Sequence, residues 1–166
     1  MLGELDEPLC IRPGDASIVD RCHGATLDVG SGPGRLTVAL AERGIPALGI
    51  DVAPYAVQLA RKAGAVALLR DVFDRVPGAG RWVTVLLADG SIGIGGDPVM
   101  LLRRVSELLT PAGEALVEVR PPGAPLRPEQ AYVGVDQIAE LATEAGLPVA
   151  ETWTADGRWF SLLRRA

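Results

Sequence analysis

The segment whose residue types and spacing most clearly indicate chemistry is a glycine-rich stretch near the amino-terminal third of the chain. It reads LDVGSGPGR from Leu27 to Arg35, with alternate glycines at Gly30, Gly32 and Gly34. Glycine permits a tight turn with positive φ and lets a ligand touch the backbone, and the amino terminus of a following helix presents unpaired N–H groups. The stretch therefore predicts a ligand-binding turn between a strand and a helix.

The spacing of these glycines separates two classes of ligand. The dinucleotide fingerprint G-x-G-x-x-G/A needs a small residue where this sequence has Arg35. Asp28 lies two residues before the first glycine, where a carboxylate would repel a pyrophosphate and suit a cationic amine. The loop thus favours a positively charged ligand. The alternative, an NAD(P)-dependent oxidoreductase, would need a catalytic Tyr/Lys or His/Asp set, and Tyr55 and Tyr132 have no such partner in the sequence.

Aspartates follow each of the next three predicted strands. Asp51 lies 21 residues after Gly30, the distance at which an acid binds ribose hydroxyls in this type of fold. Asp71 follows the third strand, where it could accept a hydrogen bond from an adenine amino group, and Asp89 follows the fourth. Because the carboxyl ends of parallel strands share one edge, we expect all three to line a crevice together with Asp28.

The elements that position these acids alternate between apolar strands and amphipathic helices. Short apolar runs typical of buried parallel strands occupy residues 25–29, 47–50, 65–69, 82–88 and 115–119. Helical spacing appears after Leu36, Ala56 and Val99, and Gly44 and Gly64 stand where a left-handed residue ends a helix. Asp97 before Pro98 predicts a helix N-cap. The pattern predicts an α/β fold with a doubly wound sheet.

The carboxyl-terminal part completes the predicted sheet. A helix is expected over residues 135–145, closed by Gly146, and strands over 149–154 and 159–163. Asp156-Gly157 favours a tight hairpin, so the last strand is expected to run antiparallel to its predecessor. The proline-rich stretch 120–128 predicts an extended loop that leaves the fifth strand at the ligand-binding edge.

Composition limits the class of protein. With 166 residues and 48% hydrophobic content, we expect one domain over 1–166 whose first 22 residues form an irregular arm. No apolar run approaches the roughly 20 residues of a membrane span, and no signal-peptide pattern opens the chain, so a cytoplasmic location is expected. The net charge is −5 without a basic cluster, which argues against nucleic-acid binding. Cys10 and Cys22 have no metal-ligand spacing, so no metal site is expected.

From residue 25 to residue 164 the chain resembles the class I S-adenosylmethionine-dependent methyltransferases. The glycine loop resembles their cofactor loop, Ile50-Asp51 their ribose acid, Arg70-Asp71-Val72 their adenine contact, and residues 108–113 the L-x-P-G-G turn before the fifth strand. The resemblance implies a seven-stranded sheet of order 3-2-1-4-5-7-6, with strand 7 antiparallel and helices on both faces. It also implies S-adenosylmethionine as cofactor and methyl transfer as reaction.

The resemblance assigns the binding residues. Those expected to bind the cofactor are Asp28, Val29, Gly30, Ser31, Gly32, Gly34, Asp51, Val52, Asp71, Val72, Ala88, Asp89 and Gly90. Ser91 and Arg120 are expected to bind the methyl acceptor, and no catalytic residue is assigned. Asp89-Gly90-Ser91 does not match the N-P-P-[YF] motif of amino-directed nucleic-acid methyltransferases, so adenine or glutamine N-methylation of that type is not expected. The expected acceptor is a small molecule. The acceptor regions are short. This leaves open a large acceptor that supplies its own cover, a partner chain or second copy that completes the site, a degraded or truncated site, or a non-catalytic cofactor-binding module.

Overall fold

A seven-stranded sheet forms the centre of the molecule. The computed structural model describes residues 10–124 and 133–166, and its strands follow the order β3-β2-β1-β4-β5-β7-β6. Neighbouring strands pair in parallel except around β7, which is antiparallel to both β5 and β6. The order and the antiparallel last strand expected from the sequence are confirmed. The strands are β1 (Thr26–Val29), β2 (Ala47–Asp51), β3 (Ala67–Leu69), β4 (Trp82–Leu87), β5 (Leu109–Val119), β6 (Val149–Ala155) and β7 (Arg158–Arg164).

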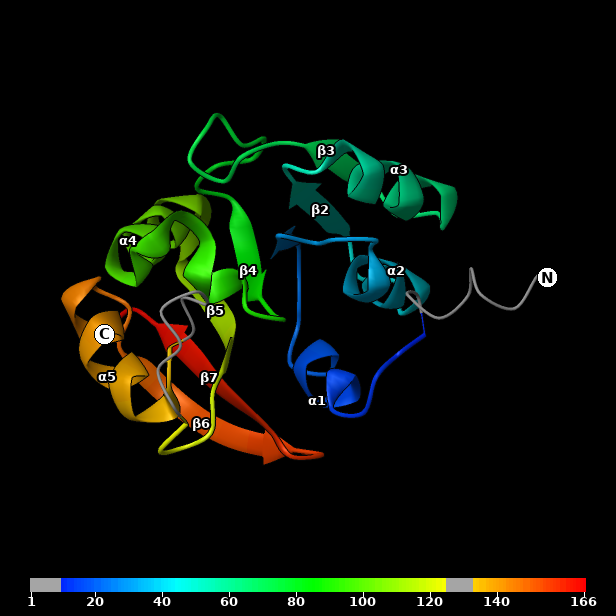
Figure 1. Ribbon diagram of the computed structural model, residues 1–166. Helices are drawn as coiled ribbons and strands as arrows, with labels where there is room; N and C mark the ends of the chain where they lie inside the picture. The colour runs from blue at the N-terminus through cyan, green and yellow to red at the C-terminus, as the bar shows by residue number, and fades with distance from the viewer. Residues whose placement is uncertain (1–9, 125–132) are drawn as a thin grey trace.

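Helices cover both faces of this sheet (Figure 1). On one face lie α1 (Asp15–Val19), α2 (Arg35–Glu42) and α3 (Pro54–Lys62), and on the other α4 (Pro98–Leu108) and α5 (Val135–Glu144). Short 3-10 turns, η2 (Ser91–Gly96), link β4 to α4. No helix among the described residues is long and apolar enough to cross a membrane.

Two apolar layers fill the space between the sheet and its helices. Val85 and Val117 point from the sheet towards Leu101 and Val105 of α4. The neighbouring positions Leu86 and Leu116 point to the other face, where they meet α1 and α2. This alternation is the period-2 geometry of a strand, and it makes both faces of the central strands apolar, as in sheets covered on both sides.

Turn residues expected from the sequence have the predicted backbone. Gly44, Gly64 and Gly146 have φ of 76°, 96° and 81° just beyond their helices. Asp156 and Gly157 join β6 to β7 with φ of 52° and 78°, as a two-residue hairpin of type I′ requires. The side chain of Asp97 accepts a hydrogen bond from the backbone N–H of Met100 at 3.1 Å, which confirms the N-cap of α4.

The structure differs from the expectations in two places. Residues 15–19, expected within an irregular arm, form the helix α1. Residues 109–113, expected as a turn, are the start of β5, where Leu109 pairs with Trp82 before the register shifts and Glu114 pairs with Thr84. The shift absorbs the extra residues as an irregularity within the strand rather than as a turn before it. Residues 125–128 of the predicted loop lie outside the described part of the chain.

Candidate functional site

The first of two adjoining cavities lies where β1, β2, β3 and β4 end. It has a volume of about 370 Å³ and opens at the carboxyl edge of the sheet, the edge at which open α/β sheets bind ligands. Its lining residues are Val29, Gly30, Ile50, Asp51, Val52, Arg70, Asp71, Val72, Asp89, Gly90, Ser91 and Ile94. The expectation that Asp51, Asp71 and Asp89 share one crevice is therefore confirmed.

The glycine loop closes this cavity from the side of β1. Gly34 precedes α2 with φ of 91°, and a Cβ placed there would lie 2.8 Å from the Cβ of Ala60, so only glycine allows α2 and α3 to approach so closely. A Cβ placed on Gly32, by contrast, would meet no atom within 4 Å. The backbone at Gly32 is therefore open to a ligand.

Asp51 at the end of β2 holds the loop in place. Its Oδ2 accepts a hydrogen bond from the N–H of Gly32 at 2.9 Å, and its Oδ1 accepts one from the N–H of Ala53 at 2.9 Å. Each carboxylate oxygen can accept more than one hydrogen bond. Asp51 can therefore position the loop and still accept hydrogen bonds from hydroxyl groups of a ligand in the cavity.

Asp28 lies beneath the loop rather than in the cavity. It is 3% exposed and accepts a hydrogen bond from the hydroxyl of Thr37 at 2.8 Å, and it is not among the lining residues. Burial, only partly opposed by the hydrogen bond from Thr37, raises the pKa of Asp28 to about 7, and the nearby negative charges of Asp89 and Asp51 add to the rise. The expectation that its carboxylate lines the crevice is wrong, because the side chain of Asp28 points from β1 into the layer beneath α2, where it meets Thr37.

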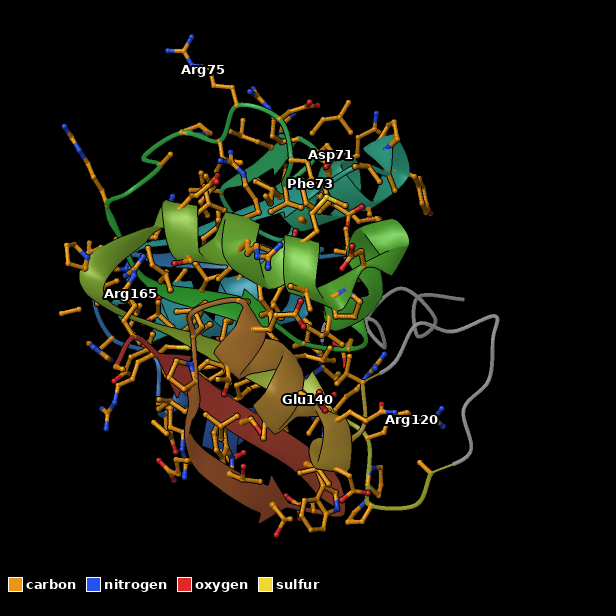
Figure 2. The ribbon with its side chains drawn as sticks, turned by 90° about the vertical axis from the view of Figure 1, so that its left-hand side faces the viewer. Asp71, Phe73, Arg75, Arg120, Glu140 and Arg165 are labelled. Carbon is orange, nitrogen blue, oxygen red and sulfur yellow. The ribbon has the colours of Figure 1, made fainter. Side chains whose placement is uncertain are left out.

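The far wall of the first cavity is mostly apolar. Val52, Val72 and Ile94 line it, and Val52 is 66% exposed. Asp71 stands at its rim, where its Oδ1 accepts a hydrogen bond from the N–H of Phe73 at 2.9 Å (Figure 2). An apolar wall with one acceptor at its edge can take a flat heterocycle that carries an amino group.

Asp89 and Gly90 line both this cavity and a second one of about 430 Å³. Asp89 has φ of 52°, a conformation that non-glycine residues rarely adopt and that accumulates at functional sites. The second cavity is more polar than the first. Its lining residues are Arg12, Asp89, Gly90, Glu118, Val119, Arg120, Pro121, Gly157, Arg158 and Trp159.

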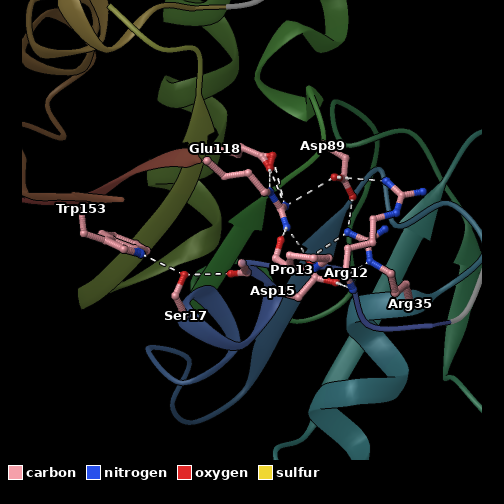
Figure 3. Close-up of polar contacts among 10 residues, drawn as sticks. Arg12, Pro13, Asp15, Ser17, Arg35, Asp89, Glu118 and Trp153 are labelled. Atoms are coloured by element: carbon pink, nitrogen blue, oxygen red, sulfur yellow. Dashed lines mark hydrogen bonds and ion pairs between the residues drawn. The ribbon is translucent and has the colours of Figure 1, made fainter. Parts of the chain in front are cut away.

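A network of ion pairs holds Asp89 in this position (Figure 3). Arg35 donates to Asp89 at 2.7 Å and to the fully buried Asp15 at 2.7 Å. Arg158 donates to Asp15 at 2.8 Å and to Glu118 at 3.0 Å. Burial opposes the charge on Asp15, but the hydrogen bonds from both arginines lower its pKa to about 2. The network joins α1, α2, β5 and β7 at the boundary between the two cavities.

Sequence reasoning missed most of this network. In the sequence Arg35 stands out only because it replaces the small residue of a dinucleotide loop, and its partners are not evident until the fold is known. Asp15, Glu118 and Arg158 lie far apart in the sequence and belong to no motif. One feature of the sequence does point to the network: Glu118 is a charged residue within the apolar pattern of β5.

The other predicted site residues divide between the two cavities and the core. Val29, Gly30, Val52, Val72 and Gly90 line the first cavity as expected. Four others lie outside it: Ser31, Gly32, Gly34 and Ala88. Ala88 is 4% exposed and packs in the apolar layer beneath α2. Of the two residues expected to contact an acceptor, Ser91 lines the first cavity and Arg120 lines the second (Figure 2).

Comparison with known proteins agrees with this geometry. Residues 26–113, just over half of the chain, match the profile of the methyltransferase domain family. A curated relative, the 2-heptyl-1-hydroxyquinolin-4(1H)-one methyltransferase of Mycobacteroides abscessus, is 33% identical over 104 residues, which are 63% of this chain. The match spans 44% of that relative's length.

Solved structures share the fold at low sequence identity. A methyltransferase of Bacteroides fragilis, solved with S-adenosylhomocysteine, superposes with a TM-score of 0.78 at 20% identity, over 94% of this chain and 78% of that one. A TehB-like methyltransferase of Corynebacterium glutamicum gives 0.75 at 17% identity, over 98% and 92% of the two chains. With the sheet order and the family match taken together, the chain belongs to the methyltransferase domain family and has the class I fold of S-adenosylmethionine-dependent methyltransferases.

Proposed function

We propose that this protein transfers a methyl group from S-adenosylmethionine to a small organic acceptor in the cytoplasm. The observation that carries the proposal is the contact between two cavities of different character at Asp89 and Gly90. The first, with its glycine loop and apolar wall, suits a nucleoside, and the second, which is open and polar, suits the acceptor. The methyl group would pass between them at the boundary.

The residues of the first cavity fit the cofactor chemically. Asp51 would accept hydrogen bonds from the ribose hydroxyls, and the open backbone near Gly32 would receive the amino-acid tail. Asp71 would accept from the adenine amino group, and Val52 and Val72 would pack on the ring. In this assignment Asp28 acts from below the loop, through its hydrogen bond with Thr37, rather than by direct contact.

The main task of the protein in this reaction is alignment. The bound cofactor supplies an electrophilic methyl carbon. Holding a nucleophile in line with that carbon is worth several kcal/mol of barrier, because orientation entropy is lost before the reaction rather than in it. Arg35 fixes Asp89 at the boundary of the cavities, so the walls that orient the two ligands belong to one rigid network. No general base is assigned to this chain.

Relatives support a small acceptor. The curated relative is named for methylation of a hydroxyquinolone, and a solved structure with a TM-score of 0.71 and 19% identity is the Burkholderia thailandensis 1,6-didemethyltoxoflavin-N1-methyltransferase. The second cavity, at about 430 Å³, has room for a bicyclic ring system of this kind. Cys22, a buried free thiol, is compatible with a reducing compartment.

Calorimetric titration of the protein with S-adenosylmethionine, S-adenosylhomocysteine and NADH tests the first half of this proposal. Binding of the two sulfur nucleosides without NADH is expected, and binding of NADH alone would reject it. Release of S-adenosylhomocysteine during incubation with hydroxyquinolines and other hydroxylated or aminated heterocycles tests the second half. A protein that binds the cofactor but turns over with none of them would instead be a cofactor-binding module.

A further inference from the structure

The loop that follows β3 carries Asp71 and Val72, which both line the first cavity. Between the end of β3 at Leu69 and the start of β4 at Trp82 the chain forms only turns and bends. One turn is closed by a hydrogen bond from the N–H of Asp74 to the carbonyl of Asp71 at 3.1 Å. The other backbone groups of the loop need partners from outside it.

Arg104 in α4 is the partner of two of these groups. Its Nε donates to the backbone carbonyl of Val72 at 2.9 Å, and its Nη2 donates to that of Asp74 at 2.8 Å. Among the described residues no other hydrogen bond reaches either carbonyl. Nε and Nη2 lie on one edge of the planar guanidinium, so this edge holds the backbone on both sides of Phe73.

The guanidinium of Arg104 is itself held in place. Its Nη1 donates to Glu107, one helical turn further along α4, at 2.8 Å. The side chain of Arg104 is only 20% exposed, whereas that of its neighbour Arg103 is 59% exposed. Hydrogen bonds from a charged donor are stronger than those between neutral groups, so Arg104 ties the loop firmly to α4.

Phe73, between the two held carbonyls, connects the backbone of the loop to the carboxylate of Asp71. Its ring packs on η2, since a Cβ placed on Gly95 would lie 2.9 Å from the ring. Its backbone N–H donates to Oδ1 of Asp71 at 2.9 Å (Figure 2). The position of Phe73 therefore sets the orientation of this carboxylate, whose Oδ2 can accept a hydrogen bond from a ligand.

We propose that Arg104 is a positioning residue that sets how the protein recognises the adenine amino group. The inference rests on the proposed function, in which Asp71 accepts a hydrogen bond from that group. Arg104 fixes the carbonyls on either side of Phe73, and Phe73 orients the carboxylate of Asp71. Because Arg104 lines neither cavity, it acts through these residues and not by contact with a ligand.

Calorimetric titration with S-adenosylhomocysteine and S-inosylhomocysteine tests this inference. The second compound has a carbonyl oxygen in place of the amino group, so it offers Asp71 no donor from that position. We expect the wild type to bind the adenine compound about tenfold more tightly, the lower limit for a hydrogen bond to a charged group. In Arg104→Met, which removes the donors and keeps an apolar stem, this ratio should fall close to one, through weaker binding of S-adenosylhomocysteine.

Arg103→Met is the matched control, because Arg103 is the adjacent residue of α4, lies 3.9 Å from Glu144 and lines neither cavity. It should keep the ratio of the wild type. An unchanged ratio in Arg104→Met, equal weakening of both compounds, or an equal loss of the ratio in Arg103→Met would overturn the inference.

A second variant, Arg104→Lys, is measured in place of Arg104→Met if urea unfolding shows that the methionine variant does not fold. One ammonium group cannot reproduce the two parallel hydrogen bonds, so the ratio should fall here too, and a ratio equal to that of the wild type would overturn the inference. Failure of the proposed function is distinct, because the wild type would then bind neither S-adenosylmethionine nor S-adenosylhomocysteine. A wild type that binds the adenine and inosine compounds equally well overturns only the role of Arg104.

Discussion

Asp51 both shapes the glycine loop and offers hydrogen-bond acceptors to the first cavity, whereas the sequence alone indicated only a ligand-binding role. Its two oxygens accept hydrogen bonds from the N–H groups of Gly32 and Ala53, so the carboxylate shapes the glycine loop before any ligand arrives. The remaining lone pairs face the first cavity, which Asp51 lines. Replacement of Asp51 should therefore affect both loop geometry and ligand affinity.

We predict that Asp51→Ala weakens binding of S-adenosylhomocysteine by about 1 to 3 kcal/mol, because ribose hydroxyls lose their acceptor. Calorimetric titration measures the change. Asp74→Ala is the control, since Asp74 is exposed and does not line the first cavity. Unchanged affinity in Asp51→Ala would reject the ribose assignment, and a loss of equal size in Asp74→Ala would show a general electrostatic effect instead.

Asp28 should make stability depend on pH. Its carboxyl has an ordinary pKa of 3.8 and is raised by burial to about 7 in the folded protein. A raised folded pKa means that the stabilisation is present below about pH 4 and is lost as pH rises through 7. The loss amounts to about 4 kcal/mol at most, from 1.36 kcal/mol per pKa unit.

The variant Asp28→Asn removes this titration and keeps an acceptor for the hydroxyl of Thr37. Its free energy of unfolding in urea, relative to that of the wild type, should therefore increase between pH 5 and pH 8. Glu140→Gln, a change at an exposed position on α5, should show no such trend (Figure 2). A difference between Asp28→Asn and wild type that is the same at both pH values would contradict a buried, protonated carboxyl.

At the scale of the elements, the glycine loop works because α2 and α3 pack closely beside it. A methyl group on Gly34 would meet Ala60 at 2.8 Å, and the second nearest atom, the Cα of Ala60, belongs to the backbone and cannot turn away. Gly44, at the other end of α2, has a similar positive φ of 76° but no atom within 4 Å of such a methyl group. Substituting alanine at Gly44 therefore measures the loss of stability from a positive φ alone, and at Gly34 the loss from a positive φ together with a steric clash.

Gly44→Ala should destabilise the protein by about 1 kcal/mol, the cost of a left-handed conformation for a residue with a Cβ. Gly34→Ala should cost at least about 1 kcal/mol more, because overpacking adds to the same backbone term. Urea unfolding gives both values. If the two variants were equally stable, the approach of α2 to α3 would not depend on the missing side chain.

Some helices and strands could be predicted from the sequence and others could not, depending on how strong a local residue pattern each one leaves. The parallel strands and the hairpin at Asp156-Gly157 were predicted correctly, because burial on both faces and a left-handed turn leave strong local patterns. Helix α1 was missed, since five residues are too few to show helical periodicity. The start of β5 was misplaced because Pro111 and Gly113 favour a turn locally, while pairing with β4 holds them in an irregular strand.

The candidate site was predictable only where residues follow a strand. Asp51, Asp71 and Asp89 were placed correctly because strand ends share an edge whatever the details of packing. Asp28 was misplaced because its position inside β1 decides which face its side chain takes, and that face is buried. Arg12 and Arg158 reach the second cavity from opposite ends of the chain, a proximity that only the folded structure reveals.

At the scale of the whole molecule, the buried ion-pair network around Asp15 links the amino-terminal part of the described chain to its last strand. Asp15 in α1 is the shared acceptor of Arg35 from α2 and Arg158 from β7, and its side chain is fully buried. Removing its charge would leave two partly buried guanidinium groups without their common partner. Breaking a buried ion pair in this way costs about 3 to 5 kcal/mol.

We therefore predict that Asp15→Asn lowers the free energy of unfolding at pH 7 by about 3 kcal/mol. The loss of stability in this variant should depend on pH. The pKa of Asp15 falls from 3.8 to about 2 on folding, so its contribution is present above pH 4 and is lost as pH falls towards 2. The stability difference between wild type and variant, measured by urea unfolding, should shrink by about 2 kcal/mol over that range.

Asp20→Asn is the control for this prediction, because Asp20 pairs with Arg43 at the surface, where its side chain is 64% exposed. Surface ion pairs contribute about 0 to 1 kcal/mol, so this variant should differ little from wild type at either pH. A constant difference for Asp15→Asn across the acid range would mean that the carboxylate is not held ionised by its arginines. In that case Arg35, which donates to both Asp15 and Asp89, would be held at the boundary of the two cavities by its ion pair with Asp89 alone.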